Sequence, residues 1–111
     1  MKYFVDYEEW KSLGSTCYFE FQKGKFKNKF WLKDSVCIHM DIFEELELYH
    51  LFNSSFGTFD YCGPNDINKE QWQIIVNNAK ENQQWQLVVE ELKLWVEGCY
   101  LEYNYFSIIG I

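Results

Sequence analysis

The chain has 111 residues, which suits one domain of ordinary size and leaves no room for a second hydrophobic core. With 48% hydrophobic and 21% aromatic residues it can bury a dense core, which excludes a disordered protein. The net charge is −7 and all ten basic residues are lysines. Because arginine is the usual side chain for gripping phosphate, direct binding of nucleic acid is not expected.

The charge is distributed unevenly along the chain. Residues 1–33 contain seven lysines and four acidic residues, whereas residues 34–111 contain three lysines and thirteen acidic residues. An acidic surface on the last two thirds would attract basic partners and repel nucleic acid. The alternative is that the acidic residues only keep a small protein dissolved.

The four cysteines are spaced by 20, 25 and 37 residues and include no C-x-x-C pair. His39 and His50 do not complete a zinc-finger spacing, so no metal site is expected. The apolar neighbours of the cysteines suit reduced thiols in the core of a cytosolic protein. The N-terminal residues lack the apolar run of a signal peptide and no segment could span a membrane, so we expect a cytoplasmic protein.

In chain order, residues 6–13 predict a short helix. Two segments follow, residues 16–22 and residues 25–33, in which apolar and polar side chains alternate as in half-buried strands with one face in water. A tight turn at Lys23 and Gly24 would join them into a hairpin. The outward lysines of the second strand either bind a ligand or guard the sheet edge against aggregation.

Residues 36–40 predict a third strand with His39 on its polar side. A lone histidine there is more typical of a surface or capping residue than of a general base. Asp41 is a plausible N-cap for a helix that runs to about Asn53. The inner stripe of this helix would comprise Ile42, Phe43, Leu46 and Tyr49.

The opposite side of the same helix has an unusual composition. It carries Asp41, Glu44, Glu45 and Glu47 around Leu48 and Leu51. Either a second layer of the protein covers these two leucines, or they form an apolar centre ringed by charge, as in many partner-binding patches.

Residues 59–72 contain a turn that leads into a helix. A glycine-proline pair marks the turn, because glycine reaches backbone angles that other residues avoid and proline fixes its own. Asn68 is a good N-cap, and Gln71 lies three residues later, where a capping box requires it. Ile67 and Trp72 occupy the positions of a hydrophobic staple.

Two apolar stripes follow, one beginning at Trp72 and the next at Trp85. At ~100° per residue, thirteen residues place the stripes roughly 220° apart, so one straight helix cannot bury both. We therefore predict a break near Asn82 and an end of the second helix at Gly98. Residues 100–111 are apolar on both sides, which predicts a last strand in the middle of the sheet, covered by helices.

These elements predict an α+β fold in a single small domain comprising residues 1–111. The sheet would be mainly antiparallel, with an N-terminal hairpin or meander and a central C-terminal strand, and would pack against about three helices.

The sequence contains no recognisable catalytic or cofactor-binding motif. It has no phosphate-binding glycine loop, no H-E-x-x-H and no G-x-S-x-G, so no cofactor and no catalytic residue are expected. Adjacent glutamates such as Glu44 and Glu45 point away from each other on a helix and cannot share a substrate. An acid/base pair drawn from distant positions, such as Asp60 with Asp66, is the enzymatic alternative.

Three short segments resemble the immunity proteins of bacterial polymorphic toxin systems, especially those paired with contact-dependent growth inhibition toxins. The segments are Asp34-Ser35-Val36 leading to Asp41-Ile42-Phe43, then Phe59-Asp60-Tyr61-Cys62-Gly63 with Ile67 and a following helix, and Phe106-Ser107-Ile108-Ile109-Gly110-Ile111. Such proteins often carry an aromatic residue before the glycine of the second segment, where this chain has Cys62. The resemblance implies a small cytoplasmic domain that binds one toxin domain tightly, covers its active site or substrate-docking surface, and performs no chemistry. Toxin domains of this kind are commonly basic nucleases that act on tRNA or DNA.

We therefore predict an immunity protein whose acidic surface docks on a cognate, basic nuclease toxin domain, with aromatic or leucine anchors and without direct contact to nucleic acid or membrane. The sequence does not indicate an oligomeric state. The predicted toxin-binding residues are Asp41, Glu44, Glu45, Glu47, Leu48, Leu51, Asp60, Tyr61 and Asp66. The alternative is a small-ligand or carbohydrate-binding module that uses surface aromatic rings, whose binding would be insensitive to salt.

Overall fold

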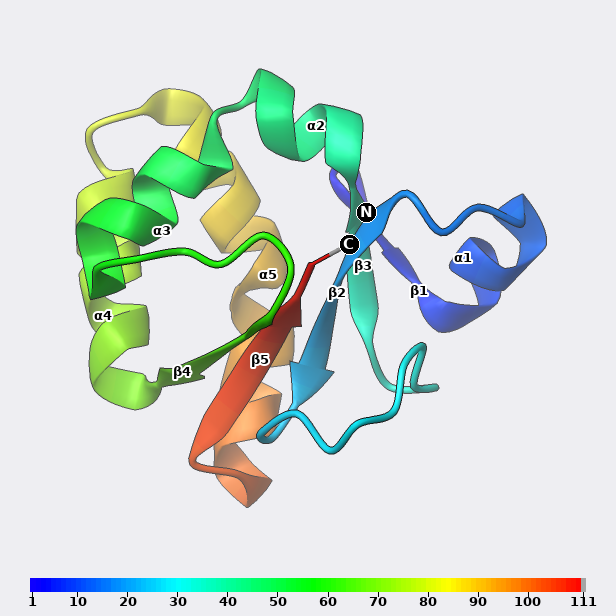
Figure 1. Ribbon diagram of the computed structural model, residues 1–111. Coiled ribbons are helices and arrows are strands. Elements are labelled where there is room, and N and C mark those ends of the chain that lie inside the picture. Colours follow the sequence, from blue (N-terminus) through cyan, green and yellow to red (C-terminus); the bar gives the residue numbers. More distant parts are fainter. Residues whose placement is uncertain (111) are drawn as a thin grey trace.

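An antiparallel sheet of five short strands forms the centre of the molecule (Figure 1). The computed structural model describes residues 1–110 of the chain. The strands lie in the order β1-β3-β2-β5-β4, with bounds Phe4–Asp6 for β1, Tyr18–Lys23 for β2, Val36–His39 for β3, Pro64–Asn68 for β4 and Tyr105–Ile109 for β5. Strand β5 pairs with β2 on one side and with β4 on the other, so its predicted central position is confirmed. Ile111, at the end of the predicted strand segment, lies outside the described residues.

Within residues 1–110, five helices accompany the sheet. They are α1 (Tyr7–Leu13), α2 (Met40–Glu45), α3 (Leu48–Phe56), α4 (Lys69–Ala79) and α5 (Gln83–Glu102). Helices α3, α4 and α5 pack on one face of the sheet, whereas α1 stands beside β1 at the sheet edge (Figure 1). The predicted α+β class, with a mainly antiparallel sheet packed against helices, is confirmed. In the described part of the chain, no helix combines the length and the apolar composition needed to cross a membrane.

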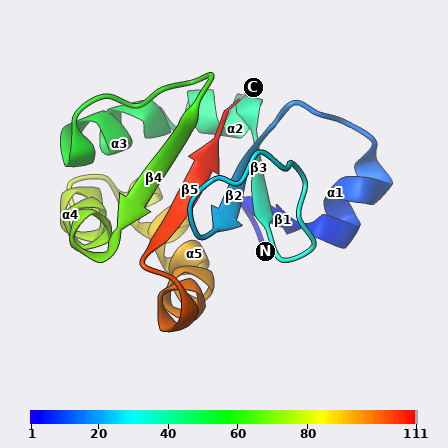
Figure 2. The ribbon, with the colours of Figure 1, turned by 60° about the horizontal axis from the view of Figure 1, so that its bottom comes forward.

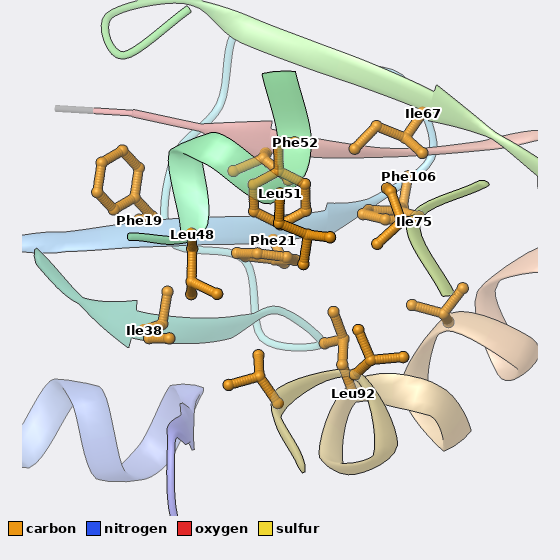
Figure 3. Packing of buried hydrophobic residues seen from close by; sticks show 14 of the residues in the cluster. Phe19, Phe21, Ile38, Leu48, Leu51, Phe52, Ile67, Ile75, Leu92 and Phe106 are labelled. Carbon is orange, nitrogen blue, oxygen red and sulfur yellow. The ribbon is translucent and has the colours of Figure 1, made fainter. Parts of the chain in front are cut away.

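The hydrophobic core fills the space between the sheet and the helices. Alternate side chains of each strand point into it, as the pleat requires, and Phe21 of β2 stacks on Phe106 of β5 with ring centroids 6.1 Å apart. Leu48 and Leu51 of α3 close over these rings, and Leu92 of α5 joins the same cluster (Figure 3). Burying a side chain of this size stabilises the fold by roughly 1.5–3 kcal/mol.

The opposite face of the sheet is polar, and its centre on β2 is closed to water. Glu20 and Gln22 of β2 point to this face and are each 1% exposed. The loop of residues 24–35 lies against it (Figure 2). The Glu20 carboxylate accepts hydrogen bonds from the backbone N–H groups of Trp31 and Leu32, both at 2.8 Å. Gln22 donates through Nε2 to the carbonyl of Lys29 at 2.7 Å.

The predicted hairpin between residues 16–22 and residues 25–33 is therefore wrong. Asn28 and Trp31 have φ values of 61° and 59°, which an extended strand does not allow. Strand β2 pairs with β3 and β5 instead. The lysines of this segment thus lie on a folded loop, and their interpretation as guards of a strand edge does not apply.

The predicted helix over residues 41–53 is interrupted. His39 rather than Asp41 is the N-cap, since His39 Nδ1 accepts the backbone N–H of Asp41 at 3.0 Å. Glu47 adopts a left-handed conformation with φ 53° and separates α2 from α3. The carbonyl of Leu46, freed at this break, accepts a hydrogen bond from Trp85 Nε1 at 2.8 Å. A distant tryptophan therefore stabilises an interruption that the local sequence does not signal.

This interruption decides the position of the two leucines that were predicted as toxin contacts. Leu48 is 0% exposed and Leu51 is 1% exposed (Figure 3). The covered alternative is correct, and the two leucines of α3 do not form an apolar centre ringed by charge.

The capping box that begins α4 is confirmed. Asn68 Oδ1 accepts the N–H of Gln71 at 2.8 Å, and Gln71 Oε1 accepts the N–H of Asn68 at 2.9 Å. The break near Asn82 is also confirmed, because Asn82 caps α5. Helix α5 does not end at Gly98 but continues to Glu102, since Gly98 keeps a helical conformation and buried Cys99 follows it inside the helix.

Candidate protein-binding surface

Four carboxylates project from α2 and from the turn that follows it. Asp41, Glu44, Glu45 and Glu47 are all exposed. Asp41 lies 3.7 Å from His39 Nδ1, and within residues 1–110 no lysine forms an ion pair with any of the four. A helix of six residues and one turn hold them within seven positions, so their negative potentials add around this end of the molecule. They do not share one face, since Glu45 lines a hollow with Lys2 and Gln84 and points away from Glu44.

The ring of Tyr61 packs against α2 and α3, near Glu44. Its centroid is 6.2 Å from that of Phe43 in α2 and 6.1 Å from that of Tyr49 in α3. The residue is 40% exposed, so part of the ring packs on the core and part faces water. Burial raises the pKa of the Tyr61 hydroxyl, and the charges of Tyr49 and Glu44 raise it further. Glu44 therefore acts electrostatically on Tyr61, and we call Asp41, Glu44, Glu45, Glu47 and Tyr61 together the α2 surface.

The backbone around Tyr61 is held by the end of β5. Asn65 Nδ2 donates to the carbonyls of Asp60 at 2.9 Å and Ile108 at 3.0 Å, and Asn65 Oδ1 accepts the N–H of Asp60 at 2.8 Å. A side chain on Gly110 would overlap the Tyr61 carbonyl, so glycine permits this close approach. Two of the three segments that resemble immunity proteins thus meet here.

Asp60 and Asp66 do not form a pair. Asp60 is exposed next to Tyr61, and its Oδ1 accepts the N–H of Cys62 at 2.9 Å within the turn. Asp66 Oδ1 accepts a hydrogen bond from Ser107 Oγ at 2.5 Å. Neighbouring Ile67 is buried in the core, so Asp66 points to the other face of the sheet and away from the α2 surface. In the described residues, no group of three metal-ligating side chains could hold an ion.

The aromatic residues mainly fill the core. Among residues 1–110, the exposed aromatic residues are Phe30, at 57%, and Tyr61, at 40%. A sugar is usually bound by rings that stand free at the surface to stack on it. The large aromatic content is therefore explained by packing, and it does not favour the carbohydrate-binding alternative.

Three exposed leucines of α5 were not recognised as surface residues from the sequence. Leu87, Leu94 and Leu101 are 43%, 81% and 87% exposed. The available signal was their spacing of seven residues, because residues seven apart lie on the same side of a helix.

Comparisons of the chain with protein-family models, with curated proteins and with solved structures find no match. The resemblance to immunity proteins therefore rests on the three sequence segments alone and stays a prediction.

Proposed function

We propose that this protein is a non-enzymatic immunity protein that acts in the cytoplasm, where it binds and neutralises a basic toxin domain. The observation that carries the proposal is the group of exposed carboxylates on α2, without lysine partners in residues 1–110, beside the exposed edge of Tyr61. Carboxylates speed association with a cationic partner, and a packed aromatic ring offers an anchor.

The contact residues are those of the α2 surface, extended by Asp60. Leu48 and Leu51 lie beneath this surface and hold α3 in place without contacting the partner. Asp66 lies on the other face of the sheet and takes no part.

A nuclease toxin explains why an acidic surface inhibits. An enzyme that acts on tRNA or DNA presents positive potential where the phosphate backbone binds. The carboxylates of the α2 surface compete with phosphate for that region, and the bound protein then blocks the active site or the approach to it. Inhibition of this kind needs no catalytic group.

The test pairs the protein with the basic C-terminal domain of a secreted protein encoded next to it. We expect co-expression to protect bacterial cells, and binding measured by calorimetry to weaken as salt rises. The double variant Glu44→Lys/Glu47→Lys should bind at least about tenfold more weakly and protect less. The matched control Glu70→Lys/Glu81→Lys carries the same charge change on exposed residues elsewhere and should protect fully.

Failure to bind or protect against such a domain would remove the proposed function. Full protection by Glu44→Lys/Glu47→Lys would instead remove α2 from the interface. Binding of an oligosaccharide that does not change with salt would favour the carbohydrate-binding alternative.

A further inference from the structure

His39 ends strand β3 and caps helix α2 with its side chain. Its Nδ1 atom accepts the backbone N–H of Asp41 at 3.0 Å, in the first turn of the helix. The residues usually found at such a position are serine, threonine, aspartate and asparagine, whose oxygen acceptors do not titrate near neutral pH. A histidine differs, because Nδ1 accepts a hydrogen bond only while it carries no proton. The cap of α2 therefore depends on one titratable nitrogen.

The side chain of Asp41 lies close to the same nitrogen. Its Oδ2 atom is 3.7 Å from His39 Nδ1, and the Asp41 side chain is 81% exposed. The backbone N–H and the carboxylate of one residue thus both lie near Nδ1, the first as a donor and the second as an acceptor. The neighbouring Met40 N–H is already bound by the Cys17 carbonyl at 2.9 Å, which ties the start of α2 to the segment before β2.

The other elements around His39 bring few charges to it. From β2, the ring of Tyr18 meets the His39 ring edge to face, with centroids 4.9 Å apart. Burial, followed by the charges of Cys37, Glu9 and Cys17, raises the pKa of the Tyr18 hydroxyl from its usual 10.0, so this group is neutral in acid. Glu9 of α1 is therefore the second carboxylate near this ring pair. In β1, Asp6 pairs with Val36, at the other end of β3, and Lys2 lines the hollow beside Glu45.

A proton on Nδ1 would reverse the polarity of the cap. An Nδ1–H group would then face the Asp41 N–H, and two donors cannot share a hydrogen bond. The Asp41 carboxylate would become the matching partner, because a protonated imidazole attracts a negative acceptor. A small rotation of the ring or of the carboxylate would bring the 3.7 Å contact to hydrogen-bond distance.

We propose that His39 is a pH-sensitive cap that exchanges these two partners as it gains a proton. Neutral His39 holds the Asp41 N–H and leaves the Asp41 carboxylate free in water. Protonated His39 releases the first turn of α2 and pairs with that carboxylate. Histidine side chains ordinarily titrate between about pH 5 and pH 8. In mildly acidic solution the exchange removes one free negative charge from the α2 surface, and only this last consequence rests on the proposed function.

The test is an NMR titration of the full-length protein, labelled with ¹⁵N and ¹³C, from about pH 8 to about pH 5. At pH 8 the ring nitrogens of His39 should show Nδ1 without a proton and Nε2 with one. A scalar coupling across the hydrogen bond should join Nδ1 to the Asp41 amide nitrogen, and it should vanish at pH 5. The Asp41 amide and carboxyl signals should both move with the midpoint of the His39 ring.

Three variants serve as controls. His39→Asn keeps a side-chain acceptor that does not titrate, so the Asp41 amide signal should stay in place between pH 8 and pH 5. His39→Ala removes the acceptor, and the amide at pH 8 should resemble that of the unaltered protein at pH 5. His50→Gln removes the other histidine of the chain and should leave the behaviour of Asp41 unchanged.

Three results would overturn the proposal. The first is a neutral His39 ring with its proton on Nδ1, and the second is no coupling to the Asp41 amide at pH 8. The third is an equal movement of the Asp41 amide in His39→Asn and in the unaltered protein.

Binding of a basic toxin domain gives a separate readout of the consequence for the α2 surface. Between about pH 7.5 and pH 5.5, the unaltered protein should lose at least about threefold more affinity than His39→Asn, because any titration of the toxin is common to both. Equal losses would show that the exchange does not affect the interface. If no such toxin domain binds at either pH, the proposed function fails, and the NMR titration still decides whether the cap switches.

Discussion

The buried carboxylate of Glu20 accepts a hydrogen bond from the hydroxyl of Ser35 at 2.6 Å. The same carboxylate accepts the N–H groups of Trp31 and Leu32, so three donors compensate a buried acid that has no basic partner among residues 1–110. Trp31 in turn stacks on Trp10 of α1 with ring centroids 4.2 Å apart. One acidic side chain thus ties the loop of residues 24–35, and through it α1, to the sheet.

Replacing Glu20 tests this role. Glu20→Ala leaves three buried donors without their acceptor and should lower the free energy of unfolding by about 2–5 kcal/mol. Urea unfolding measures the loss, and hydrogen exchange at the Trp31 and Leu32 amides measures the release of the loop. Glu8→Ala, on an exposed carboxylate of α1, should change stability by less than about 0.5 kcal/mol. Unchanged protection of the two amides would contradict this account of the loop.

Alkaline pH should destabilise the protein partly through Cys37. Burial, and then the charge of Glu20, raises the pKa of the Cys37 thiol from 9.0 to about 12. The unfolded chain loses this proton at lower pH than the folded protein does, so the contribution is complete below pH 9 and is lost as the pH rises to about 12. Tyr100, whose pKa is also raised by burial, adds to the same decline.

The measurement is urea unfolding at about pH 8 and about pH 10. Cys37→Ala should lose less stability between the two pH values than the unaltered protein, because it lacks the buried thiol. Cys62→Ala removes an exposed thiol and should follow the unaltered protein. Parallel declines in all three proteins would exclude the Cys37 contribution.

Two of the four thiols should react with a thiol reagent in the folded protein, and the other two should be protected. Cys17 and Cys62 are exposed, whereas Cys37 and Cys99 are buried, so the burial predicted for all four holds for two. Maleimide treatment near neutral pH followed by mass spectrometry should add two groups, on Cys17 and Cys62, and four groups in denaturant. Modification of Cys37 in the folded protein would show that the second face of the sheet opens.

The capping box of α4 should contribute measurably to stability. Asn68→Ala removes the acceptor for the Gln71 N–H and should cost about 1 kcal/mol in urea unfolding. Asn77→Ala, at an exposed position inside the same helix, should cost nothing and can stabilise slightly. Equal effects of both changes would show that the cap is not the cause.

Two leucines should lose very different amounts of stability when each is truncated to alanine. Leu51→Ala removes a side chain that is 1% exposed and should cost about 2–5 kcal/mol. Leu94→Ala removes one that is 81% exposed and should cost less than about 0.5 kcal/mol. Thermal or urea unfolding of the two variants compares them directly, and a large loss for Leu94→Ala would mean that this side of α5 is covered within the protein.

The sequence by itself determined the features whose causes lie within a few residues. Asn68 and Gln71 cap each other across one helical turn, and Asn82 ends one apolar stripe just before the next begins. The position of strand β5 inside the sheet was predictable from the apolar side chains on both of its faces, because only a strand covered on both faces can bury them. The exposure of the acidic residues on α2 was also predictable. The apolar residues of the same helix face the core, and this leaves its acidic side in water.

The tertiary structure decided what depends on partners distant in the chain. Residues 25–33 alternate like a strand, but Glu20 and Gln22 draw them into a loop with hydrogen bonds that sheet pairing would not supply. Glu47 interrupts a continuous helical pattern, and the freed Leu46 carbonyl is satisfied by Trp85, 39 residues away. That interruption buried Leu48 and Leu51. Periodicity records which faces of a segment are apolar, but only the packed molecule fixes where each segment bends and which polar groups its backbone must satisfy.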